Sequence, residues 1–102
     1  MDIMSNGAVV ELHGDFDVRS TSEVRNAIYQ RLDAHSDLVV VDMTAVDAVD
    51  LTALKVLAVA TLRANRQGHH LVLRGCGPAV RRMLHLSRLA HAVEVERAAA
   101  TA

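Results

Sequence analysis

The sequence predicts a single α/β domain built on a mostly parallel sheet, and three observations support this prediction. The apolar run Leu38–Val41 fits a strand buried on both faces, as strands of a parallel sheet are. Strand-like and helix-like segments alternate along the chain, which requires crossover connections between parallel strands. The 102 residues, 51% of them hydrophobic, suffice for one core. We therefore expect one domain over residues 1–102, with a four- to five-stranded sheet and crossover helices.

The N-terminal segment predicts two strands joined by a tight turn. Residues Met1–Asn6 can form a short edge strand, and the pair Asn6-Gly7 is a turn signal. Residues Ala8–His13 read as the first main strand. The run Gly14–Asp17 is expected to end that strand and begin a loop.

A capping box is expected at the start of the first helix. Ser20 fits the N-cap, and Glu23 fits the position from which a side chain reaches back. The apolar side chains that follow recur at helical spacing and predict a buried stripe: Val24, Ala27, Ile28 and Leu32. The segment His35-Ser36-Asp37 is expected to break this helix.

The residues after Val41 predict an acidic loop followed by a second helix. Asp42, Asp47 and Asp50 fall in the expected loop, and apolar residues recur at helical spacing from Leu54 onward. Either Asp50 or Thr52 can cap this helix.

The last third of the chain repeats the alternation. The second helix should end near Gln67 because Gly68 can act as a C-terminal stop. A strand is expected over His70–Arg74, and Pro78 suits the first position of a third helix. A final short strand is expected over 92–95, which places the core at about residues 8–95 and leaves 97–102 as a frayed tail.

Two acidic segments should meet at one edge of the sheet, because loops at the carboxyl ends of parallel strands gather there. Asp15 and Asp17 follow the first main strand, and the loop after the Leu38 strand carries Asp42, Asp47 and Asp50, with Thr52 following. A phosphate on Thr52 would be stabilised by the helix N-terminus and destabilised by its acidic neighbours. This position therefore suits a reversible charge switch, although simple helix capping explains the same residues.

Composition argues against several classes of function. The net charge is −1 and the only aromatic residues are Phe16 and Tyr29, which disfavours nucleic-acid binding. No apolar run approaches the ~20 residues that span a bilayer, and no signal peptide is evident. A single cysteine, Cys76, fits a reducing compartment, so a cytoplasmic protein is expected.

Catalytic and cofactor signals are weak. No glycine-rich nucleotide-binding pattern occurs, and no cofactor is predicted. The clustered carboxylates could hold Mg²⁺ and the His69-His70 pair could bind a metal, but neither has a diagnostic spacing, so no metal site is predicted. Cys76 lies between two glycines before a helix start, which could activate its thiol, but a small residue in a turn is the simpler interpretation.

Three segments together resemble the STAS domain, which occurs in anti-sigma-factor antagonists and sulphate-transporter tails. Residues 13–17 (HGDFD) are similar to the family's "GELD" turn. Residues 39–57 are similar to the strand, loop and helix that carry "hDSSGL", where h is apolar. Residues 77–84 (GPAVRRML) are similar to the helix "sPaVrrlL". The three segments occur in the family's order, and the resemblance runs from about Ala8 to Val95, nearly the whole chain.

The resemblance implies a non-enzymatic regulator that binds an anti-sigma factor, a protein with a histidine-kinase-like ATPase fold, and thereby releases a sigma factor. In the antagonists that kinase phosphorylates the second serine of "DSSG", a position that Thr52 occupies here. The partner-binding residues that the resemblance implies are Asp15, Asp17, Asp50, Leu51, Thr52, Ala53 and Lys55.

Alternatives stay open at the sequence level. Leu51 replaces the first serine of the motif and Ala53 replaces its glycine, so the chain also fits a constitutive scaffold. One form of such a scaffold is a cytoplasmic subunit of a lipid-transport ABC complex, whose partner would be a transporter ATPase. A small enzyme using the acidic edge is a third class, and homodimer formation is also left open.

Overall fold

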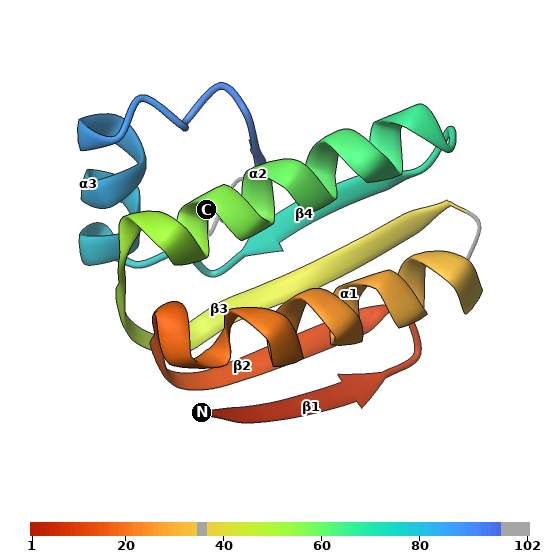
Figure 1. Ribbon diagram of the computed structural model, residues 1–102, viewed down its shortest axis with the longest axis horizontal. Coiled ribbons are helices and arrows are strands. Elements are labelled where there is room, and N and C mark those ends of the chain that lie inside the picture. The colour runs from red at the N-terminus through yellow and green to blue at the C-terminus, as the bar shows by residue number, and fades with distance from the viewer. Residues whose placement is uncertain (35–36, 97–102) are drawn as a thin grey trace, which may run out of the picture.

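The computed structural model describes residues 1–34 and 37–96, which form one sheet with helices packed against it (Figure 1). The elements are, in order, β1 (Asp2–Asn6), β2 (Val9–Phe16), the 3₁₀ helix η1 (Val18–Ser20), α1 (Thr21–Ala34), β3 (Leu38–Val49), α2 (Leu51–Arg66), β4 (His70–Arg74), α3 (Pro78–Leu86) and β5 (Glu94–Val95). The sheet order is β1-β2-β3-β4-β5; β1 is antiparallel to β2, and the other pairs are parallel. The predicted mostly parallel sheet is therefore confirmed.

Helices α1 and α2 lie side by side on one face of the sheet and run in the same direction (Figure 1). This arrangement follows from two successive β-α-β crossovers, each of which returns the chain to the same end of the sheet. Helix α3 packs against β3 and contributes Val80 and Leu84 to the core. No helix within the described ranges is both long and apolar enough to cross a bilayer.

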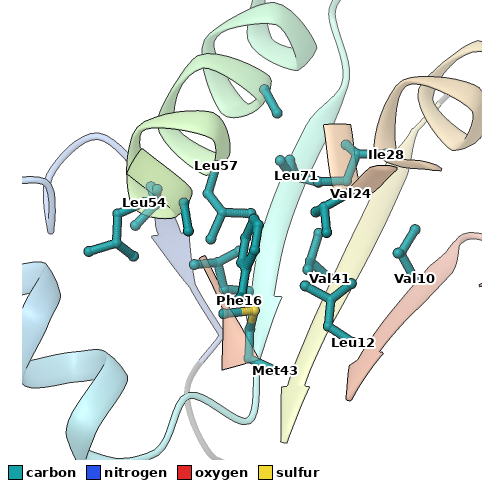
Figure 2. Close-up of a cluster of buried hydrophobic side chains, with 14 of the residues drawn as sticks. Val10, Leu12, Phe16, Val24, Ile28, Val41, Met43, Leu54, Leu57 and Leu71 are labelled. Carbon is teal, nitrogen blue, oxygen red and sulfur yellow. The ribbon is translucent and has the colours of Figure 1, made fainter. Parts of the chain in front are cut away.

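The core is largely aliphatic, as the composition predicts (Figure 2). Leu12 of β2 and Val24 and Ile28 of α1 are fully or almost fully buried, as is Leu57 of α2. Phe16 is the one aromatic side chain within the core cluster and is completely buried. Burial of each such side chain contributes roughly 1.5–3 kcal/mol, so the helix stripes hold α1 and α2 to the sheet.

The first part of strand β3 is apolar on both faces, as the run Leu38–Val41 predicts. Val39 and Val41 join the main core, and Val40 points to the other face beside Val72, its register partner on β4. Val40 is only 3% exposed. A segment that is apolar on both faces suits the centre of a parallel sheet.

The main strands are longer than the sequence predicts. Strand β2 continues through Gly14 and Asp15 to Phe16, and β3 continues to Val49. Residues expected in an acidic loop, Asp42 and Asp47, therefore lie within β3, and that expectation is wrong.

Two irregularities in the pairing of β2 with β3 explain the difference. From Glu11 to His13, β2 advances two residues while the paired segment of β3, Asp42–Ala45, advances three, so β3 carries one extra residue there. A second extra residue of β3 lies opposite the segment from Gly14 to Phe16. Such bulges interrupt the alternation of faces. The apolar residues Met43 and Val46 are both buried at a spacing that is not period two, so the pattern does not read as a strand.

Asp42 stabilises the first of these bulges. Its Oδ1 accepts hydrogen bonds from the Thr44 backbone N–H at 2.9 Å and from the Thr44 hydroxyl at 2.6 Å. A carboxylate that bonds its own backbone two residues on is a common turn device. Asp42 therefore has a local structural role within β3.

Several other expectations are confirmed. Strand β4 spans His70–Arg74, as predicted, and Pro78 begins α3. Gly68 follows α2 with φ +76°, which suits a helix stop, and β1 is an antiparallel edge strand. The predicted break at His35-Ser36 and the predicted frayed tail at 97–102 lie outside the described residues.

We expect Val40→Asp to unfold the domain, because a buried carboxylate without a partner costs several kcal/mol. Leu38→Asp is the matched control, since Leu38 lies two residues earlier on the same strand and is 43% exposed. Urea and thermal unfolding followed by circular dichroism compare the two variants. A Val40→Asp protein with the wild-type melting temperature would contradict the central placement of β3.

Candidate functional site

The candidate site lies where β2 and β3 end next to each other. Phe16 and Val49 are the last paired residues of the two strands, and Asp17 and Asp50 follow them directly. The Asp50 backbone N–H donates to the Phe16 carbonyl oxygen at 3.3 Å. Parallel pairing thus brings together two residues that are 33 positions apart in the sequence, counting from 17 to 50.

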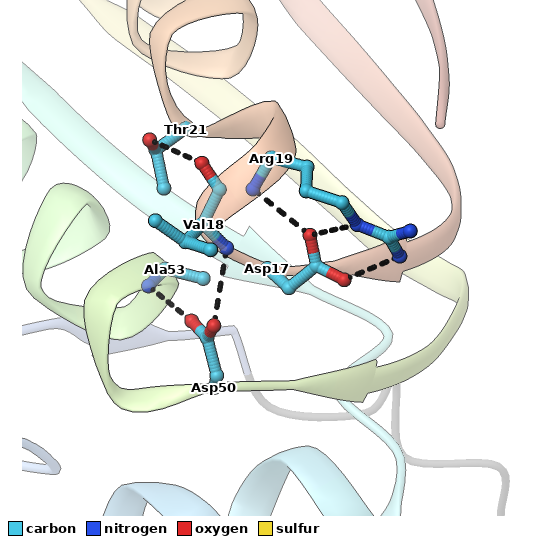
Figure 3. A network of polar contacts seen from close by, with 6 residues as sticks. All are labelled: Asp17, Val18, Arg19, Thr21, Asp50 and Ala53. Atoms are coloured by element: carbon cyan, nitrogen blue, oxygen red, sulfur yellow. Dashed lines mark hydrogen bonds and ion pairs between the residues drawn. The ribbon is translucent and has the colours of Figure 1, made fainter.

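The Asp50 carboxylate joins the two segments (Figure 3). Its Oδ1 accepts a hydrogen bond from the Ala53 backbone N–H at 2.8 Å and thereby caps α2. Its Oδ2 accepts from the Val18 backbone N–H at 3.1 Å. One side chain therefore caps a helix and fixes the segment after β2 beside it, so the capping alternative is assigned to Asp50 rather than Thr52.

Asp17 has the capping role that the sequence suggests for Ser20. Its Oδ1 accepts from the Arg19 backbone N–H at 3.0 Å, and its carboxylate pairs with the Arg19 guanidinium at 2.8 Å (Figure 3). The chain begins a 3₁₀ turn at Val18, three residues before α1, so Ser20 is already helical and buried and the predicted capping box is wrong. The hydrogen bonds from Arg19 lower the pKa of the Asp17 carboxyl below its ordinary value.

The first turn of α2 presents two side chains to solvent. Leu51 is the first helical residue and is 44% exposed, and Thr52 beside it is also exposed. Ala53 is fully buried and contributes only its backbone N–H to this region. The exposed residues Asp15 on β2 and Lys55 on α2 complete the set that the family resemblance implies.

Three residues near the site are absent from the sequence-based set. Val18 is 61% exposed, and its backbone is bound to Asp50. Arg19 pairs with Asp17. Arg25 of α1 lines a hollow of about 260 Å³ together with Thr52 and Lys55. No local pattern signals Arg25, because it meets Thr52 only through the packing of α1 beside α2.

The electrostatic surroundings of Thr52 are consequently mixed rather than acidic. Both oxygens of Asp50 accept backbone N–H groups, and Asp17 is paired with Arg19. Two basic side chains, Arg25 and Lys55, share the hollow with Thr52. An anionic group on Thr52 would therefore lie near the cationic side chains of Arg25 and Lys55 as well as near carboxylates.

The remaining acidic residues do not join the site. Asp42 lies partway along β3, opposite Glu11, and Asp47 is exposed within the same strand. The expectation that all the loop carboxylates share one edge is therefore wrong. Across residues 1–34 and 37–96, no three side chains of His, Cys, Asp or Glu gather as a metal site would require.

Cys76 does not have the features of an activated nucleophile. Its side chain is buried in the turn before α3, and burial raises the pKa of its thiol. Arg81 lowers that pKa, but its effect is the smaller one. The thiolate is therefore disfavoured, which supports the interpretation of a small residue packed in a turn.

The chain matches a protein-family model described as "Mlab, STAS domain" over residues 1–95. Among curated protein sequences, none matches it. Its fold is similar to several solved structures. A candidate anti-sigma factor antagonist from Thermotoga maritima has a TM-score of 0.76 at 16% identity, covering 96% of this chain and 86% of the other.

Two further structures are similar in the same way. An anti-sigma factor antagonist from Mycobacterium paratuberculosis has a TM-score of 0.73 at 25% identity, covering 95% of this chain and 84% of the other. RsbS from Moorella thermoacetica has a TM-score of 0.72 at 22% identity, with coverages of 93% and 84%. The fold of this chain is therefore that of these proteins.

We expect Asp50→Ala to destabilise the protein by about 1–2 kcal/mol, because it removes the cap of α2 and the hydrogen bond to Val18. The stability of Asp50→Asn should lie between those of Asp50→Ala and wild type, since an amide keeps one acceptor oxygen. Asp47→Ala is the control and should change stability by less than about 0.5 kcal/mol. Urea unfolding gives the free energies of unfolding, and amide hydrogen exchange at Val18 reports whether the segment after β2 is still held by residue 50. Unchanged exchange at Val18 in Asp50→Ala would contradict the bridging role.

Proposed function

This chain belongs to the STAS-domain family, and on that basis we propose that it is a bacterial, cytoplasmic anti-sigma-factor antagonist. In this role it binds an anti-sigma factor with a histidine-kinase-like ATPase fold and so releases a sigma factor, without catalysing a reaction. The observation that carries the proposal is the Asp50 bridge, which holds the exposed start of α2 beside the segment after β2.

The surface formed there has the composition of a protein-binding site. Val18 and Leu51 are exposed apolar side chains on either side of the Asp50 bridge. Charged side chains surround them: Asp15, Asp17, Arg19 and Lys55. An apolar centre with a polar rim is typical of protein–protein interfaces. Because the two segments are tied by hydrogen bonds, little conformational entropy would be lost on binding.

Phosphorylation of Thr52 would act as the switch in this proposal. The exposed hydroxyl lies in the first turn of α2, where backbone N–H groups favour an anion. Arg25 and Lys55 line the same hollow and would offset the charge of Asp50. The folded state should therefore tolerate the phosphate. A partner shaped for a neutral hydroxyl would instead meet a hydrated dianion, which costs several kcal/mol at an interface.

A constitutive scaffold is the second candidate function, with a transporter ATPase as its partner. Leu51 favours it, because an exposed leucine replaces the first serine of the family motif and offers a permanent apolar contact. Ala53 replaces the motif glycine, and the fold accommodates its methyl group in a fully buried position. Affinity purification from the native host separates the candidates: a histidine-kinase-like ATPase supports the antagonist, and a transporter ATPase supports the scaffold.

We expect Leu51→Glu to weaken binding of the purified partner by roughly 1–3 kcal/mol, because it places a charge at the apolar centre of the interface. Folding should be nearly unchanged, since Leu51 is 44% exposed. Leu86→Glu on α3 is the control, since Leu86 is a leucine exposed to 68% on a different helix. Calorimetric titration measures both affinities. Equal affinity for Leu51→Glu and wild type would place the interface elsewhere.

We expect Thr52→Glu to bind the partner poorly and Thr52→Ala to bind like wild type, because only Thr52→Glu places a charge where the partner surface fits a neutral side chain. Both variants should melt near the wild-type temperature, since Thr52 is exposed. Calorimetry gives the affinities, and mass spectrometry of protein from growing cells tests for phosphate on Thr52. Equal affinities together with no phosphate under any growth condition would favour the constitutive scaffold.

A further inference from the structure

The outer surface between α1 and α2 contains a groove. One end of the groove lies at the proposed partner site, and the rest extends beyond that site. It consists of two adjoining hollows of about 260 and 390 Å³, which share Tyr29 of α1 and Val59 of α2. The first hollow begins at Thr52, and the second ends at Arg66 and Gln67. We call the two hollows together the α1–α2 groove.

The middle of the α1–α2 groove is apolar and accessible. Val59 is 57% exposed and Leu62 is 49% exposed, although both lie on a helix whose opposite side is packed in the core. Tyr29 is partly buried beside them. Two large exposed apolar side chains within one turn of a helix, next to a tyrosine, form a contact surface rather than isolated exposed residues.

The rim of this groove is uniformly basic. Arg25, Lys55, Arg63 and Arg66 line the two hollows, and no acidic residue lines either of them. Helix α2 contains no Asp or Glu at all, although the whole chain has a net charge of −1. The Arg63 guanidinium stacks on the Tyr29 ring at 4.1 Å from its centroid, which holds one cation of the rim in place beside the tyrosine.

We propose that the α1–α2 groove binds an amphipathic helix of a partner protein whose apolar face is flanked by Asp and Glu. The apolar centre matches such a helix face, and the basic rim is complementary to acidic flanks. The span from Thr52 to Arg66 is about 21 Å at 1.5 Å per residue, which accommodates about four helical turns. A third helix can pack on two parallel helices through the ridges of their side chains. This surface adjoins the one that the Asp50 bridge organises: the two share Thr52 and Lys55, and the groove extends from there to Arg66 and Gln67.

The test uses the full chain and two synthetic amphipathic peptides of equal length with the same leucine face, one flanked by glutamate and the other by lysine. Fluorescence anisotropy of the labelled peptides measures affinity, and amide chemical shifts locate the contact. We expect the leucine–glutamate peptide to bind, to shift the amides of Val59 and Leu62, and to weaken as salt rises. The leucine–lysine peptide should bind at least about tenfold more weakly.

Matched variants locate the binding. Leu62→Glu and Arg66→Glu should each reduce the affinity for the leucine–glutamate peptide by about tenfold. Leu86→Glu and Arg82→Glu make the same changes at exposed positions on α3 and should have no effect. Leu51→Glu should also leave peptide binding unchanged, which separates this proposal from the proposed function. If Leu62→Glu fails to fold, Arg66→Glu carries the test alone.

Four outcomes would overturn the proposal. The first is equal binding of both peptides, and the second is unchanged binding in the Leu62→Glu and Arg66→Glu variants. The third is self-association, measured by sedimentation, that these variants abolish, which would make a second copy of this chain the occupant. The fourth is binding to phosphatidylglycerol vesicles, but not to the leucine–glutamate peptide, that the same variants abolish, which would make an anionic membrane the occupant.

Discussion

The parallel pairing of β3 with β2 and β4 is the constraint on which the rest of the molecule depends. Val39 and Val41 anchor α1 and α2 on one face, while Val40 is buried on the other, so β3 has to lie inside the sheet. Parallel neighbours require crossover helices, and these place the ends of β2 and β3 at the same edge. The position of Asp17 beside Asp50 is a consequence of this pairing.

The Asp50 carboxylate converts that proximity into a defined surface. Each of its two oxygens accepts a backbone N–H, one from the cap of α2 and one from the segment after β2. A monodentate acceptor, such as a serine hydroxyl, could cap the helix but would not reach both donors in the same way. The site is therefore organised by hydrogen bonds to the backbone, and the two side chains that face solvent at the start of α2, Leu51 and Thr52, take no part in them.

The near-zero net charge of the chain conceals a separation of charge along α2. Carboxylates gather at its N-terminal end, where Asp50 and Asp17 are used in capping, and all the charged side chains within the helix are basic. Negative charge at a helix N-terminus and positive charge toward its C-terminus both suit the helix dipole. The same arrangement leaves a basic, partly apolar face on the outside of the α1 and α2 layer.

Local signals in the sequence predict the order of strands and helices along the chain, the central place of β3 and the position of Asp50 and Thr52 at the start of α2. These features rest on local signals: the apolar run Leu38–Val41, helical spacing, and the punctuation by Gly68 and Pro78. The continuation of β3 to Val49 depends on its pairing with β2, because bulges in that pairing break the alternating pattern that identifies a strand. Likewise, only the packing of α1 beside α2 brings Arg25 to Thr52 and Tyr29 to Arg63, since no local pattern records which helix faces will meet.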